Sequence, residues 1–379
     1  MSDSTALTAE LEISRLHVPD IPECIDIARR SFEHFDGNVS AIQNWFDARV
    51  LNNPWQQALD GIGVAVRDAG KLIAFRAMFA QPWWIEGQPS VVAFAAHTCI
   101  EPDYRGRGVG SRMIAVSRDV ATLTGSTSAG NVTQKIYAKQ GYVAVGGVSD
   151  DFFRLRASYV GSMQSRLGST LGLLSGSVAD ALLRSPEQTL GDARGFHLEP
   201  VTLCNDEFDG LWIRARPDYA SCLERSSRYL NWRVFDFPTH PLLMLALRDE
   251  RHQLRGYGIW HHQQYSNHVS CAVLRDLFVP SDDGEALRAF LLLAIRHWRR
   301  LGVTWANLEV ASDRLTGVFA SLGFQRIPSV GNRYHIHSQL PLDRETLAKW
   351  FRSGLDGDYF DTRPLDREAA SKVGMTHDQ

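Results

Sequence analysis

The segment with the clearest chemical signature is a glycine-rich loop at Arg105–Ser111, Arg-Gly-Arg-Gly-Val-Gly-Ser. It follows an apolar stretch typical of a strand (Ser90–Ile100) and precedes a stretch with helical apolar spacing (Ser111–Ala121). Glycines let a backbone turn tightly and approach a ligand closely, so amides of the loop and of the following helix can face an anion. Arg105 and Arg107 add charge suited to phosphates. The segment therefore predicts a diphosphate-binding site.

The glycine spacing separates this loop from two other phosphate-binding motifs. A Walker loop ends in Gly-Lys-Ser/Thr, and the sequence has no such ending here. A dinucleotide fingerprint needs Gly-x-Gly-x-x-Gly after the first strand of a domain, whereas this loop has closer glycines and lies in mid-domain. The pattern that remains is Arg-x-x-Gly-x-Gly, with Arg105, Gly108 and Gly110. A surface turn that binds nothing is the alternative interpretation.

A second group of residues follows the loop at a defined distance. After Ile100-x-Pro102-x-x-Arg105-Gly-x-Gly108-x-Gly110 come Asn131 and then Tyr137-x-x-x-Gly141-Tyr142. In order and spacing this segment resembles the GCN5-related N-acetyltransferase (GNAT) superfamily, and the resemblance covers residues 10–155. It implies an α/β (α+β) fold, with a mixed twisted sheet flanked by helices, and acetyl-CoA as the acyl donor.

The resemblance also implies roles for individual residues. The strand backbone at Thr98, Cys99 and Ile100 would hold the pantetheine arm, and Asn131 would contact the CoA arm. The pyrophosphate would be bound by the loop amides, those of Arg105, Gly106, Arg107, Gly108, Val109, Gly110 and Ser111. Tyr137 would protonate the departing thiolate. A tyrosine, with an ordinary pKa of about 10, is protonated at neutral pH and can give its proton to a thiolate whose conjugate acid has a pKa of about 8.5.

The general base is less well defined by the sequence. Many members of the superfamily use a Glu on the strand before the loop, but the matching position here is apolar, near Phe94. His97 is the imidazole on that strand, and an ordinary imidazole pKa of about 6.5 suits a base. A core histidine is the alternative. Glu101 lies too close to the expected phosphates, and Cys99 as a nucleophile is the alternative to direct transfer.

The chain also contains an internal repeat. Three landmarks recur in order at separations of 178 to 184 residues: Arg49 and Pro54 with Arg233 and Pro238, Ile100-Glu-Pro102 with Phe278-Val-Pro280, and Tyr137 to Tyr142 with Phe319 to Phe324. Two copies of one domain are therefore expected. The division is an N-terminal GNAT domain at 1–155, a linker helix at 156–194, a degenerate GNAT-like domain at 195–340 and a tail at 341–379.

The second copy lacks the residues of the motif that would bind the diphosphate and donate a proton. A single glycine, Gly284, stands among Asp282, Asp283 and Glu285, and these carboxylates would repel a diphosphate. Phe319 replaces the tyrosine, so the hydroxyl is absent as well. The second copy is therefore expected not to bind CoA, and to have a structural and acceptor-binding role.

Several residues are candidates for the acceptor side. The aromatic and polar segment Tyr257–Tyr265 and the repeated Arg49 and Arg233 could face an acceptor, although each arginine could instead form a structural salt bridge. The adjacent His261 and His262 lack a third ligand at a suitable spacing, so no metal is expected.

The linker has helical apolar spacing from Met163 to Arg184, interrupted by Gly168, Gly172 and Gly176. We expect one helix that packs across both domains. A membrane-surface helix is the alternative, which the scarcity of basic residues disfavours.

Composition limits the class of protein. Hydrophobic residues make up 44% and charged residues 22%, as in ordinary globular proteins, and the net charge of −3 argues against a nucleic-acid partner. No apolar run approaches the ~20 residues that a membrane span needs. The five cysteines are odd in number and contain no Cys-x-x-Cys pair, which favours reduced thiols and a cytoplasmic location.

Together these observations predict an acetyl-CoA-dependent N-acetyltransferase that acts by direct attack of an amine. The expected acceptor is a primary amine of a small molecule such as an amino sugar, an amino acid or a related metabolite. A non-catalytic CoA-binding or scaffolding protein and a longer-chain acyltransferase are the alternatives. The sequence leaves the acceptor and the oligomeric state open.

Overall fold

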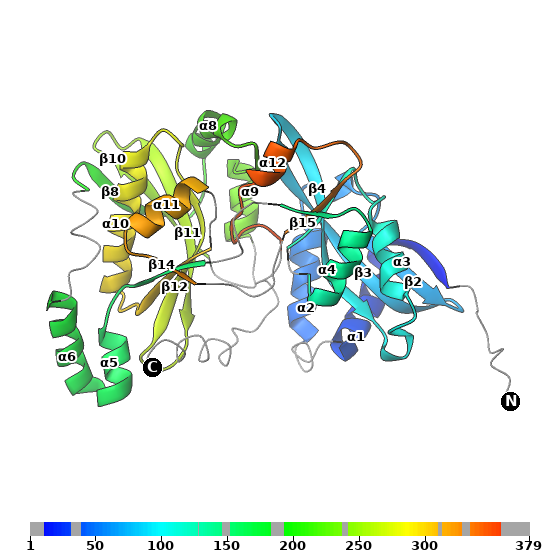
Figure 1. Cartoon of the computed structure of the whole chain (residues 1–379), viewed down its shortest axis with the longest axis horizontal. Helices are drawn as coiled ribbons and strands as arrows, with labels where there is room; N and C mark the ends of the chain where they lie inside the picture. Colours follow the sequence, from blue (N-terminus) through cyan, green and yellow to red (C-terminus); the bar gives the residue numbers. More distant parts are fainter. Residues whose placement is uncertain are drawn as a thin grey trace. The chain divides into compact units, whose positions relative to one another are not determined.

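The chain forms two compact units, each built around one mixed β-sheet (Figure 1). The computed structural model describes residues 11–31, 39–127, 129–145, 152–182, 193–236, 242–309, 313–327 and 334–357. Unit 1 comprises Met1–Val145, Gly331–Leu347 and Gly357–Arg363, and unit 2 comprises Gly146–Val330, Ala348–Asp356 and Pro364–Gln379. Neither unit is continuous in sequence.

The sheet of unit 1 contains β1 (Glu12–Leu16), β2 (Gly63–Asp68), β3 (Lys71–Ile85), β4 (Gln88–Ile100), β5 (Leu123–Ser126), β6 (Val143–Ala144) and β15 (His335–Ser338). These strands follow the spatial order β1-β2-β3-β4-β5-β15-β6. Strands β1 to β4 are antiparallel, β4 and β5 are parallel, and β15 is antiparallel to both β5 and β6. The helices that start in this unit are α1 (Ile21–Ser31), α2 (Val39–Phe46), α3 (Val109–Ser117), α4 (Asn131–Lys139) and, near the C-terminus, α12 (Arg344–Ala348).

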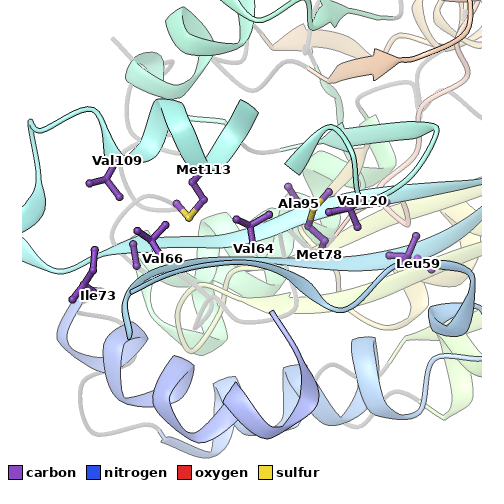
Figure 2. Close-up of a cluster of buried hydrophobic side chains, with 12 residues drawn as sticks. Leu59, Val64, Val66, Ile73, Met78, Ala95, Val109, Met113 and Val120 are labelled. Carbon is purple, nitrogen blue, oxygen red and sulfur yellow. The ribbon is translucent and has the colours of Figure 1, made fainter. Parts of the chain in front are cut away.

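Alternation along β3 sends successive side chains to opposite faces of this sheet. Met78 packs in a core cluster with Val109 and Met113 of α3, whereas Phe79 lies against Trp45 of α2. Figure 2 shows Met113 pointing from its helix toward the strands of the sheet. Full burial of such a side chain contributes about 1.5–3 kcal/mol. This packing fixes the first turn of α3, and with it the end of the glycine-rich loop.

A bulge interrupts the pairing of β4 with β3. Arg76 pairs with Thr98, but Ala77 pairs with Ala96, so His97 is the extra residue, with a backbone φ of +42°. The pairing of β4 with β5 extends only from Val92 to Phe94. The last residues of β4 therefore leave the β4–β5 ladder, and the two strands part toward their carboxyl ends.

Unit 2 repeats this pattern. Its sheet contains β7 (Phe152–Arg156), β8 (Phe196–Val201), β10 (Leu243–Asp249), β11 (Leu254–Gln264), β12 (Ser270–Phe278), β13 (Trp305–Leu308) and β14 (Gln325–Ile327), in the order β14-β7-β13-β12-β11-β10-β8. The central pair β12–β13 is parallel and the other pairs are antiparallel. The helices include α8 (Asp206–Ala215), α9 (Ser227–Leu230), α10 (Gly284–Arg300) and α11 (Asp313–Ser321). A bulge at Arg275 interrupts the β11–β12 pair.

The two repeats exchange one strand. Strand β7 follows the first repeat in sequence but pairs with β13 and β14, whereas β15 follows the second repeat and pairs with β5 and β6. In Figure 1, β15 is labelled among the strands of unit 1. The sequence-based division at residues 155 and 195 does not include this exchange, because alternation of apolar residues identifies a strand but not its partner.

The linker forms two helices, α5 (Val160–Leu167) and α6 (Ser169–Leu182), where one helix was expected. Gly168, with a φ of +80°, separates them. A Cβ at Gly172 or Gly176 would overlap the backbone of α5, so these glycines allow the two helices to pack closely. Arg184, the expected end of the helix, lies outside the described residues, as do Pro238 and the tail from 358 onward. No helix in the described part of the chain combines the length and apolar character that crossing a membrane requires.

We expect the N-terminal part of the chain to need β15 for its stability. A fragment of residues 1–155 should lack a cooperative unfolding transition, because β5 and β6 lose the strand that pairs with both. Val145 and Tyr334 are joined by a backbone hydrogen bond of 3.0 Å, so a fragment in which residues 1–145 continue through a short Gly-Ser loop into 331–347 completes the sheet. Circular dichroism during heating distinguishes the two, and equal cooperative transitions would show that β15 is dispensable.

Candidate functional site

The glycine-rich loop has the geometry of an anion-binding turn. Gly106 and Gly108 have φ values of +78° and +77°, in the left-handed region that favours glycine, and a Cβ at either would meet open space. Gly108 caps α3 and offers no side-chain acceptor to the first amides of the helix. Arg105 and Arg107 are exposed beside it. The first turn of α3 therefore presents donors and a positive helix end to a ligand.

The loop is tied to the end of β4. Arg105 Nε donates a hydrogen bond of 3.0 Å to the carbonyl of Ile100. Gly110 lies against the side chain of Ile100, with 3.3 Å between the Ile100 Cδ1 and the place of a Cβ. Thr98, Cys99 and Ile100 form the part of β4 that has left the β4–β5 ladder. The predicted pantetheine strand and the predicted pyrophosphate loop are thus adjacent in the structure.

Tyr137 is buried on α4, and its hydroxyl group contacts a buried arginine. The Nη2 of Arg76 donates to the Tyr137 oxygen at 2.6 Å, and the Nη1 donates to the Thr98 Oγ1 at 2.9 Å. The structure therefore joins Tyr137 to the expected pantetheine strand through Arg76. Asn131 is the first residue of the same helix and is exposed.

Arg76 keeps its charge despite its burial. Burial works against the charged guanidinium, but the interactions with Tyr137 and Tyr142 more than offset it and hold the pKa of Arg76 above its ordinary value. Nothing in the sequence analysis singled out this residue. The available signal was a lone charged side chain in the otherwise apolar run from Leu72 to Ala80.

Further polar side chains surround Tyr137. Its ring stacks on Tyr142 with 4.3 Å between centroids, and the Tyr142 hydroxyl lies 3.1 Å from the Thr124 Oγ1. The exchanged strand β15 adds His335, 5.2 Å from the Tyr137 ring, and His337, 5.3 Å from the Tyr142 ring. Burial, with a smaller effect of Arg118, lowers the pKa of His337. No local signal in the sequence connects these histidines to Tyr137, because their proximity depends on the strand exchange.

The structure does not bring His97 to Tyr137. The His97 ring packs edge-on against Trp45 of α2 with 4.5 Å between centroids, which places it on the other face of the sheet. The position where the superfamily has its Glu lies in an aromatic cluster, since Phe94 stacks on Trp83 at 5.8 Å. The role of His97 as a base stays a prediction.

The acceptor-side candidates are mostly buried. Arg49 lies in a π-helical turn (Asp47–Leu51), where it donates to the Gly357 carbonyl at 2.8 Å, and Arg233 lies in a matching turn (Asn231–Phe235). In the segment Tyr257–Tyr265, Tyr257 and Trp260 are core residues rather than surface residues.

The two adjacent histidines of that segment do not act as a pair. His261 is buried and accepts a hydrogen bond of 3.0 Å from Arg275, whereas His262 is exposed. Among the described residues, no group of three or more His, Cys, Asp or Glu side chains is arranged to hold a metal.

The corresponding places in unit 2 are occupied by the chain itself. The Asp283 carboxylate caps α10 by accepting from the Ala286 amide at 3.0 Å, and it forms an ion pair of 2.6 Å with Arg255. The Gly354 amide donates to the Arg275 carbonyl at 2.7 Å, and Glu309, directly after β13, lies against Gly354. The backbone at Gly354 therefore lies at the point where β12 and β13 part.

Comparison with known proteins identifies the architecture. The sequence matches no family model and no curated protein. Its structure is similar to that of a GCN5-related N-acetyltransferase from Anabaena variabilis ATCC 29413, with a TM-score of 0.54 and 16% identity over 87% of this chain and 73% of that chain. A probable N-acyltransferase from Enterococcus faecalis V583 gives a TM-score of 0.57 and 9% identity over 86% and 72% of the two chains. The chain has the GNAT fold.

The GNAT fold expected from the sequence motifs is thereby confirmed, and the two sheets fit its tandem arrangement. A third similar structure is that of Saccharomyces cerevisiae N-myristoyltransferase with bound myristoyl-CoA and inhibitors. Its TM-score is 0.52, with 11% identity over 89% of this chain and 82% of that chain.

We predict that the thiols do not react in the folded protein. All five cysteines are buried, burial raises the pKa of Cys99 well above its ordinary value, and it raises the pKa values of Cys204, Cys222 and Cys271 to about 12. Because the thiolate is the reactive form, an aromatic disulfide reagent at pH 8 should label less than one thiol per native chain and all five after unfolding. Rapid labelling of Cys99 in the native protein would revive the thiol-intermediate alternative.

Proposed function

We propose that this protein is an acyl-CoA-dependent N-acyltransferase with its cofactor site in unit 1. One observation carries the proposal: the first turn of α3, which no side chain caps, lies beside the end of β4 that does not pair with β5. A tyrosine hydroxyl is linked to that strand end through Arg76. An anion site, an open strand edge and a proton donor are the parts that a CoA thioester requires. The GNAT fold of the similar structures supports the same assignment.

The donor would be held by residues already described. The amides from Arg105 to Ser111, with the two loop arginines, suit a pyrophosphate. The backbone of Thr98, Cys99 and Ile100 suits the amides of a pantetheine arm, because the β5 ladder ends before it. Asn131, exposed at the start of α4, is the candidate for a further contact with the CoA arm. When bound, the donor supplies an activated acyl group.

Tyr137 is the candidate general acid. A neutral amine attacks the thioester carbonyl, the carbon–sulfur bond breaks, and the phenol gives its proton to the sulfur. Direct transfer is favoured over a thiol intermediate because Cys99 is buried and its raised pKa disfavours the thiolate. The amine loses its proton to a base or to water. His97 is the predicted base, and its place on the opposite face from Tyr137 would put proton removal and proton donation on two sides of the sheet.

Unit 2 is proposed to have a structural role without a cofactor. Asp283 takes the place that a pyrophosphate would need at the start of α10, and the backbone at Gly354 takes the place of a pantetheine arm beside β12. Phe319 has no hydroxyl and packs against Phe153 and Phe324. One donor site per chain is therefore expected.

We propose acetyl-CoA as the donor and a small-molecule primary amine as the acceptor, in a cytoplasmic enzyme with reduced thiols. The similarity to a structure of N-myristoyltransferase with bound myristoyl-CoA favours one competing donor, a long-chain acyl-CoA. The two donors are distinguished by their relative affinities for the purified protein.

Calorimetric titration with acetyl-CoA, long-chain acyl-CoAs and free CoA should show one site per chain, with acetyl-CoA preferred over the longer donors. Gly108→Trp should lower the affinity at least 100-fold, because the bulky side chain fills the open space beside the amides of the glycine-rich loop. Gly302→Trp is a matched control, since Gly302 has a similar φ of +72°, open space around its Cβ position and a location in unit 2. Two sites per chain, or equal losses in both variants, would contradict the assignment.

Tyr137→Phe should lower kcat by about 10²- to 10⁴-fold while the affinity for acetyl-CoA stays within a factor of about three. The variant removes the proton donor and keeps the ring that stacks on Tyr142. The measurement is thiol release from acetyl-CoA with whichever primary amine reacts in a screen of amino sugars and amino acids. Tyr142→Phe is the control, and a smaller effect is expected. An unchanged kcat in Tyr137→Phe would exclude Tyr137 as the acid.

A further inference from the structure

Arg76 differs from two other buried arginines, Arg225 and Arg275, in its partners. Arg225, also buried, forms two 3.0 Å hydrogen bonds with the Asp276 carboxylate, and Arg275 is paired with Glu309. Arg76 has neutral partners, Thr98 and Tyr137, and no Asp or Glu side chain of the described residues pairs with it. A buried charge without a counter-ion is unfavourable in the resting protein. Such a charge is useful where an anion arrives or forms.

The geometry indicates which anion this is. The Nη2 of Arg76 already donates to the Tyr137 oxygen at 2.6 Å, and the guanidinium lies under the Tyr137 ring at 5.5 Å from its centroid. The Nε is buried and has no hydrogen-bond partner among the described residues. To contact Arg76 through both the Nε and the Nη2, a substrate carboxylate would have to displace the Tyr137 hydroxyl from the Nη2. A negative charge on the Tyr137 oxygen needs no displacement at all.

We propose that Arg76 is the counter-ion for the negative charge that the departing CoA passes to Tyr137. This inference rests on the proposed acyltransferase function and adds a residue to it. Arg76 acts on the reaction through Tyr137, and Thr98 holds the guanidinium in place on β4.

In the proposed step, each bond that breaks is matched by a bond that forms. The amine nitrogen forms a bond to the acyl carbon, the carbon–sulfur bond breaks, and its electron pair goes to sulfur. Tyr137 gives its proton to the sulfur, which leaves as the CoA thiol, and the phenol oxygen takes the negative charge opposite Arg76. The proton that the amine nitrogen loses goes to the base or to water, and the phenol oxygen regains a proton from water. The products are an amide and CoA, with no oxidant or reductant.

The same arrangement affects free CoA. A bound thiol next to Tyr137 can share its ionisation with the phenol, and the guanidinium stabilises the resulting negative charge on either atom. Binding of CoA should therefore release a proton at a pH where the free thiol is still protonated. Acetyl-CoA has no free thiol. The number of protons released when it binds is therefore the baseline for every proton exchange of the cofactor other than that of the thiol.

Several other titratable or charged groups lie near this position. They come from the turn after α4, from the exchanged strand and from the residue that caps the end of α3: Tyr142, His335, His337 and Arg118. His335 is the imidazole in contact with Tyr137, so a His335→Gln variant separates its contribution from that of Arg76.

The experiment is calorimetry of the full chain with CoA and with acetyl-CoA at pH 7.5, in buffers of different ionisation enthalpy. If the guanidinium shifts the shared ionisation by about two units from an ordinary thiol value of about 8.5, CoA should release about 0.8 proton more than acetyl-CoA. Arg76→Gln should reduce this difference to about zero, and Arg76→Lys should keep part of it. His335→Gln should leave it unchanged.

Thermal unfolding provides the matched control. Arg76→Gln should melt at the same temperature or higher, because it removes a buried charge that has no counter-ion, whereas Arg225→Gln should melt lower because it leaves Asp276 unpaired. An unchanged proton difference in folded Arg76→Gln overturns the inference. Failure of the wild-type protein to bind acetyl-CoA overturns the proposed function itself, and the inference with it.

Discussion

Strand β5 has four residues, and its parallel partner β4 pairs with it along only three of them. Strand β15 pairs antiparallel with all four residues of β5, and β15 also pairs with β6. Ile336, at the centre of β15, is fully buried, and its side chain fills the space above Gly125 beside Phe94. The parting of β4 and β5 that gives the candidate site its open edge is possible because β15 satisfies the other side of β5.

The two units share a fold but differ in charge at the equivalent helix starts, that of α3 in unit 1 and that of α10 in unit 2. In unit 1 the first turn of a helix faces outward past Gly108, and a buried guanidinium lies behind it at Tyr137. In unit 2 the equivalent helix start is closed by the Asp283 carboxylate, and the buried Arg225 is paired with Asp276. Carboxylates thus balance the positive charge at these two places in unit 2, whereas Arg76 in unit 1 has neutral partners.

The sequence contained the parts of the site that depend on local pattern. Gly106 and Gly108 were recognisable because their left-handed backbone requires glycine, and Tyr137 was recognisable from its spacing to Gly141. The sequence did not reveal which strand completes each sheet, since β6 has two residues and a pattern that short specifies no partner. The contact between His335 and Tyr137 follows from that pairing and was out of reach for the same reason.

The exchange of β7 and β15 has a consequence for biosynthesis. All strands of the first unit except β15 have left the ribosome once residue 145 has been made and has cleared the exit tunnel, but the sheet cannot close until residues 335–338 follow. At roughly 5–20 residues per second, the intervening 190 or so residues take about 10 to 40 seconds to translate. During that interval β5 has an open edge of the kind that recruits chaperones or pairs with neighbouring chains. The final arrangement of the N-terminal half is therefore decided only after residues 335–338 have been made.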